Sequence, residues 1–113
     1  MASPARVLHV VGGMGRGGAE TMIMNLYRQV DRSRLQFDFL CTHTGEQSYD
    51  AEIRDLGGRI IHIDGPARAG YRRYLRQAKR AMLQYGPFGA VHAHTLFNTG
   101  FIAVVAKRAQ VPV

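Results

Sequence analysis

The sequence has one cysteine and no tryptophan among its 113 residues. Because Cys41 is alone, no disulfide can form within the chain, and a metal centre built on several thiolates is excluded. We expect Cys41 to lie at a strand end as a small hydrophobic residue. No apolar run approaches the roughly 20 residues needed to cross a bilayer, so no membrane-spanning helix is predicted.

Acidic residues are also scarce, since eight stand against fifteen lysines and arginines, and the net charge of +7 favours an anionic partner. The first residues lack the basic start and apolar block of a secretory signal, so we expect a cytoplasmic protein. Hydrophobic residues make up 46% of the chain and are spread along it. This composition predicts one globular domain over residues 1–113.

Short apolar runs alternate with helical patterns along the chain. We predict strands at residues 6–11, 36–41, 59–63 and 89–93, and helices at residues 19–30, 49–56, 71–85 and 98–109. Residues 111–113 look like the start of a fifth strand, cut off. This order predicts an α/β fold, a doubly wound parallel Rossmann-like sheet in three α/β/α layers. In the first helix, the apolar positions expected to face the sheet are Ala19, Met22, Ile23, Leu26 and Val30.

Five glycines fall within residues 12–18, directly after the first predicted strand. Glycines allow positive φ and let backbone N–H groups approach a ligand, and the start of the following helix favours negative charge. Arg16 is a candidate for a further contact to phosphate. The turn therefore predicts a phosphate-bearing ligand.

Gly13, Gly15 and Gly18 also match the G-x-G-x-x-G pattern of dinucleotide-binding domains. Such domains place an acidic residue at the end of the second strand to hold a ribose hydroxyl. Asp38 has about that spacing but lies inside the predicted strand rather than at its end. An NAD- or flavin-binding Rossmann domain therefore remains an alternative, as does a non-catalytic interaction module.

The fourth predicted strand ends in His92-Ala93-His94-Thr95. If Val91 and Ala93 share one face of the strand, His92 and His94 share the other, and His94 stands nearest the ligand-binding edge. A zinc centre is the alternative use of this pair, but no neighbouring carboxylate or thiol completes it. The other histidines are treated as structural or surface residues, namely His9, His43 and His62.

Four segments together carry a family resemblance: VLHVV at residues 7–11, RGGAET at 16–21, VHAH at 91–94 and AQVPV at 109–113. With them the chain resembles the N-terminal domain of retaining GT-B glycosyltransferases of family 4. The stretch that runs from RGGAET into MIMNLY resembles most the bacterial enzymes that build capsular or extracellular polysaccharide. The resemblance covers nearly the whole chain.

The resemblance implies one half of a two-domain enzyme that transfers a sugar from a nucleotide sugar to a glycan or lipid-linked acceptor. Residues 1–113 would be the acceptor-side domain, truncated in strand five, and inactive without the C-terminal domain that holds the nucleotide sugar. It also implies roles for single residues: His94 beside the transferred sugar, Gly17 and Gly18 near the donor diphosphate, Thr95 and Asn98 toward the acceptor. No metal and no cofactor are implied.

The predicted helix at residues 71–85 carries a basic face and no acidic residue. A plain solvated face is the first interpretation, and a contact with an anionic membrane surface or lipid-linked acceptor, at the inner face of the membrane, is the alternative. Nucleic acid is not expected because no recognition motif accompanies the charges. The basic residues concerned are Arg72, Arg73, Arg76, Lys79 and Arg80.

Overall fold

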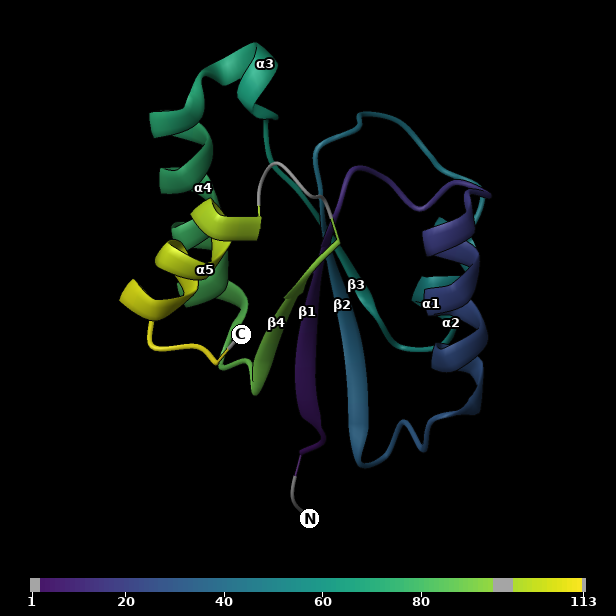
Figure 1. Ribbon diagram of the computed structural model, residues 1–113. Helices are drawn as coiled ribbons and strands as arrows, with labels where there is room; N and C mark the ends of the chain where they lie inside the picture. Colours follow the sequence, from purple (N-terminus) through teal and green to yellow (C-terminus); the bar gives the residue numbers. More distant parts are fainter. Residues whose placement is uncertain (1–2, 95–98, 113) are drawn as a thin grey trace.

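The computed structural model describes residues 3–94 and 99–112, and it shows one parallel sheet with helices on both faces (Figure 1). Its strands are β1 (Ala5–Val11), β2 (Leu35–Cys41), β3 (Arg59–His62) and β4 (Ala90–Ala93). Its helices are α1 (Gly18–Gln29), α2 (Asp50–Asp55), α3 (Pro66–Ala69), α4 (Tyr71–Tyr85) and α5 (Thr99–Arg108). The strands follow the spatial order β3-β2-β1-β4 and every pair is parallel. The predicted fold class is confirmed.

Two hydrophobic cores lie on opposite faces of this sheet. Leu8 and Val10 of β1 join the core under α4 and α5, whereas Val11 joins the core under α1 and α2. The alternation arises because successive side chains of a strand point to opposite faces. Figure 1 shows α1 and α2 on one side of the strands and α4 and α5 on the other. The three predicted layers are therefore present.

Helix α1 buries a different face from the predicted one. Its buried residues are Ile23, Met24 and Tyr27, while Met22 and Leu26 are 63% and 56% exposed. The Tyr27 ring stacks on Phe37 at 4.9 Å, and its hydroxyl donates to the side-chain oxygen of Gln36. A buried tyrosine contributes more apolar area than a leucine and still satisfies its hydroxyl here. The stripe of Ala19, Met22 and Leu26 was therefore wrongly assigned to the core.

Two short segments also differ from the expectation. The turn-rich stretch at residues 64–70 contains the single-turn helix α3, which begins at Pro66. No strand forms at Val111 and Pro112, although the Val91 N–H donates to the Pro112 carbonyl at 2.7 Å. The chain after α5 thus returns to the free edge of β4, as the predicted fifth strand requires.

Candidate functional site

Three histidines meet where β1 and β4 end. The two strands are parallel neighbours, and His9 stands opposite His92 in their register. Partners in register point to the same face, and His94, two residues after His92, points there as well. The His9 Nδ1 lies 2.9 Å from the His94 Nε2, and the ring centroids of His92 and His94 are 3.9 Å apart. The predicted pairing of His92 with His94 on one face is confirmed.

Burial differs within this histidine cluster, defined as His9, His92 and His94, because His9 is buried, His94 half-buried and His92 exposed. His9 is only 4% exposed, and burial lowers its pKa to about 3, with a smaller effect from the charges of His94 and His92. Burial also lowers the pKa of His94, and His92 adds to this, while the carboxylate of Glu20 opposes it. His9 and His94 are therefore neutral imidazoles at pH 7.

Reasoning from the sequence missed His9, which was treated as structural or surface. The signal was the pairing of β1 with β4: once residues 7–10 are set beside residues 90–93, His9 falls opposite His92. One ring nitrogen from each of the three histidines lies within 4.8 Å of the others, so the cluster has the composition of a possible metal centre.

The glycine-rich turn is held by main-chain hydrogen bonds and by the buried side chain of Met14. Met14 is fully buried in the core under α1, and its carbonyl accepts from the Tyr49 N–H at 2.9 Å. The Gly12 carbonyl accepts from the N–H groups of Thr42 and His43 at 3.0 and 2.8 Å. The turn is thus fastened to the loop that follows β2.

None of the glycines within residues 12–18 has positive φ, contrary to the expectation. Gly13 is closely packed, since a Cβ there would lie 3.1 Å from Nδ1 and 3.2 Å from Cβ of His43. A Cβ on Gly17 would collide with the Glu20 carboxylate, whereas a Cβ on Gly18 meets nothing within 4 Å. Gly18 therefore has room for a side chain within this chain.

The predicted donor-side residues stand at the start of α1. Gly17 is the N-cap of this helix and Gly18 its first residue, and both are exposed. Arg16 precedes them with an exposed side chain that makes no hydrogen bond or ion pair to any residue the structure describes. The carboxylate of Glu20, in the first turn of α1, acts by its charge to raise the pKa of His94. Thr95 and Asn98 lie outside the described residues.

The residues considered for other chemistry are buried. Asp38 is 0% exposed in the middle of β2, so its carboxylate does not reach a ribose at the strand end. Cys41 ends β2 and is 2% exposed, and burial, with a smaller effect of Asp50, raises the pKa of its thiol to about 12. The interpretation of Cys41 as a small hydrophobic residue at a strand end is confirmed.

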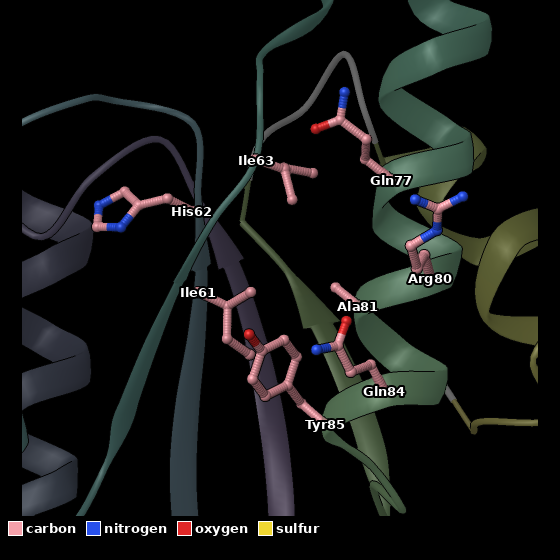
Figure 2. Close-up of a pocket in the computed structure, with 8 residues that line it drawn as sticks. All are labelled: Ile61, His62, Ile63, Gln77, Arg80, Ala81, Gln84 and Tyr85. Atoms are coloured by element: carbon pink, nitrogen blue, oxygen red, sulfur yellow. The ribbon is translucent and has the colours of Figure 1, made fainter.

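A groove of about 230 Å³ lies elsewhere, between the outer strand β3 and helix α4. Figure 2 shows the polar ends of Gln77, Arg80 and Gln84 along α4, and the His62 ring turned away from them. None of the residues that line this groove belongs to the histidine cluster or the glycine-rich turn. The groove is therefore separate from the predicted site.

The basic face of α4 is exposed, as predicted. It continues toward α5, where a groove of about 340 Å³ is lined by Arg72, Arg76, Lys79 and Arg108 together with Leu75 and Val104. Leu83 and Val104 are 61% and 52% exposed beside these charges. None of the described helices is both long enough and apolar enough to span a membrane.

Comparison with known proteins agrees with this architecture. The family described as "Glycosyl transferase 4-like domain" matches residues 17–113. EpsF of Bacillus subtilis (strain 168), which carries a glycosyltransferase name, is 51% identical over 112 residues, or 99% of this chain and 29% of that protein. The capsular polysaccharide biosynthesis glycosyltransferase CapH of Staphylococcus aureus is 27% identical over 108 residues, or 94% of this chain and 28% of that protein. The chain thus spans under a third of these relatives, and no solved structure matches it at comparable significance.

Proposed function

The chain belongs to the glycosyl transferase 4-like domain family, and from this premise we propose that it is part of the acceptor-side domain of a sugar-transferring enzyme. The donor is a nucleotide sugar, and the acceptor is a glycan or lipid-linked glycan in polysaccharide biosynthesis. The names of EpsF and CapH support the reaction, and that of CapH supports the pathway. A second domain holds the nucleotide, so the 113-residue chain alone is inactive in this proposal.

The observation that carries the proposal is that the start of α1 and His94 follow the neighbouring parallel strands β1 and β4, and so lie at the same carboxyl edge of the sheet. Ligands of doubly wound sheets bind beyond the carboxyl ends of the strands, where the strand order reverses. That reversal falls between β1 and β4 here. A diphosphate at Gly17 and Gly18 would face free N–H groups and the positive end of the helix dipole.

In this arrangement the leaving diphosphate is stabilised by fixed backbone dipoles and by Arg16, which is the electrostatic mode of catalysis. His94, as a neutral imidazole, contacts the transferred sugar without adding charge. Thr95 and Asn98, which follow β4 in the sequence, are proposed to line the acceptor. The proposal assigns no metal ion and no cofactor to this chain, because the family resemblance implies none.

A transferase assay on the full-length protein tests this function. With a panel of UDP- and GDP-sugars and extracted lipid-linked acceptor, we expect release of nucleoside diphosphate. Replacing His94 by Ala should lower kcat by about 10² or more, the effect typical of losing one preorganised polar contact. His62→Ala, an exposed histidine on β3, is the matched control and should retain the wild-type rate. Binding of NAD or flavin in place of any nucleotide sugar would contradict the proposal.

We further propose that the exposed basic face of α4 rests on an anionic membrane surface. Lysines and arginines with interspersed apolar side chains are typical of helices that lie on lipid. Leu83 and Val104 are the exposed apolar residues beside the charges here. Contact of this face with the cytoplasmic leaflet would bring the protein to lipid-linked acceptors.

Vesicle co-sedimentation tests the membrane contact. The protein should pellet with phosphatidylglycerol-containing vesicles at low salt, and binding should weaken as salt rises. The double variant Arg76→Gln/Lys79→Gln should reduce binding at least tenfold, since each basic residue near the lipid adds to the attraction. Arg28→Gln/Arg54→Gln removes the same charge from α1 and α2 on the opposite layer and should bind as wild type. Equal binding to uncharged vesicles would contradict the contact.

A further inference from the structure

The contact between His9 and His94 leaves one ring nitrogen of the buried residue without a partner. The His9 Nδ1 is 2.9 Å from the His94 Nε2, and the His9 Nε2 is buried with no hydrogen-bond partner among the described residues. The His9 ring packs against the rings of Phe37 and Phe39, whose centroids lie 4.3 and 5.4 Å from its own. A neutral imidazole carries one N–H and one bare nitrogen, so the pair can be arranged in only two ways.

The two arrangements differ in whether the buried His9 Nε2 carries a proton. If the His94 Nε2 donates, the His9 proton must sit on Nε2, where a buried N–H lacks an acceptor at a cost of about 1–3 kcal/mol. A contact of that N–H with an aromatic ring replaces only part of a hydrogen bond. If the His9 Nδ1 donates, the atom left over is a bare nitrogen, which is unpaired as well. Among buried backbone groups, however, unpaired acceptors are tolerated more often than unpaired donors, and we extend that preference to the imidazole. The second arrangement is therefore favoured.

We propose that His9 is a positioning residue whose Nδ1–H donates to the His94 Nε2 and holds His94 as its Nδ1–H tautomer. His94 then meets its ligand as a hydrogen-bond donor to an oxygen atom, and not as a base. The hydrogen bond is a property of the free protein; only the identity of the ligand, a nucleotide sugar, rests on the proposed function. His9 itself touches no ligand.

A bound metal ion is the competing use of the same three histidines, and the geometry disfavours it. Nitrogens about a tetrahedral zinc ion lie roughly 3.3 Å apart, given Zn–N bonds of about 2.0 Å. His9 and His94 are closer than this, at 2.9 Å, the distance of a hydrogen bond. A ligating histidine also normally donates its other N–H to a partner, which the His9 Nε2 lacks.

The tautomer can be measured directly by two-bond ¹H–¹⁵N NMR of the intact protein with ¹⁵N-labelled histidine. We expect His94 to be protonated at Nδ1 and bare at Nε2, and His9 to be protonated at Nδ1. Protonation of the His94 Nε2 in the wild-type spectrum would overturn the proposal, and this reading needs no variant to fold. A chemical-shift change of all three histidine signals on addition of equimolar Zn²⁺ would also overturn the proposal, in favour of a metal centre.

Matched variants separate the hydrogen bond from the shape of the ring. The amide nitrogen of Asn sits near the position of the His Nδ1, so His9→Asn should keep the His94 tautomer. His9→Phe fills the space without a donor, so His94 should become a mixture of tautomers with kcat/KM lowered at least tenfold. An unchanged His94 spectrum in His9→Phe would overturn the proposal. If the tautomer is confirmed but no nucleotide sugar moves the His94 signals, the proposed function fails while the positioning role stands.

Discussion

Arg59 surrounds the carboxylate of Asp38 from the neighbouring strand. The Arg59 main-chain N–H and Nε donate to one oxygen of Asp38 at 2.9 and 3.2 Å, and Nη2 donates to the other at 2.7 Å. The same Nη2 reaches the Tyr85 carbonyl at 2.8 Å, which ties the end of α4 to the sheet. The acidic residue that suggested a ribose contact thus joins β2, β3 and α4.

Replacement of Asp38 by Asn should therefore destabilise the fold. Loss of the charged acceptor should lower the free energy of unfolding by about 1.5–3 kcal/mol. Urea unfolding followed by far-ultraviolet circular dichroism measures this. Glu46→Gln, which breaks the exposed pair with Arg54, is the control and should match the wild type. Equal losses in the two variants would argue against a structural role specific to Asp38.

The face that α1 buries can be tested by paired truncations. Ile23→Ala should lower the free energy of unfolding by about 3 kcal/mol, because it leaves a cavity in the core. Leu26→Ala, one turn away and largely exposed, should change it by no more than about 0.5 kcal/mol. Thermal or urea unfolding of the two variants distinguishes the faces. A larger loss of unfolding free energy for Leu26→Ala than for Ile23→Ala would support the buried face predicted from the sequence.

Two substitutions in the glycine-rich turn should separate an effect on packing from an effect on ligand binding. Gly13→Ala forces the new methyl group against His43 and should cost about 1 kcal/mol of stability. Gly18→Ala has free space within the chain and should change stability by no more than about 0.5 kcal/mol. In the full-length enzyme, however, the Gly18 methyl group would occupy the proposed diphosphate position, so KM for the nucleotide sugar should rise several-fold. A Gly18→Ala enzyme with unchanged KM would exclude that position.

His9 should make the protein sensitive to acid. Its pKa is lowered from 6.5 to about 3 in the fold, so between these values the unfolded chain binds a proton that the folded chain does not. The stability contribution is complete above pH 6.5 and is lost as the pH falls toward 3, amounting to about 2–3 kcal/mol by about pH 4.5. Urea unfolding at several pH values should show a steeper loss for wild type than for His9→Phe. His94 and His92, which face His9, are present in both proteins, so parallel profiles would contradict the assignment.

Much of the fold follows from local pattern. The alternation of apolar runs with amphipathic stretches predicted four strands and four of the helices, and α4 coincides with its predicted range. The shared face of His92 and His94 follows from the same two-residue period. These features could be predicted because each depends on residues only a few positions apart, whose directions the backbone geometry sets.

By itself, then, the sequence determined the order of the elements, the parallel sheet and the place of His94 at the carboxyl edge of its strands. Only the tertiary structure decided that Tyr27 rather than Leu26 turns inward, that Asp38 binds Arg59, and that His9 meets His94 across 85 residues of chain. Each of these outcomes is a competition between contacts from separate elements. Local periodicity predicts which side chains share a face of a helix or strand. Which of these side chains becomes buried, and which residue it contacts, depends on the element that packs against that face.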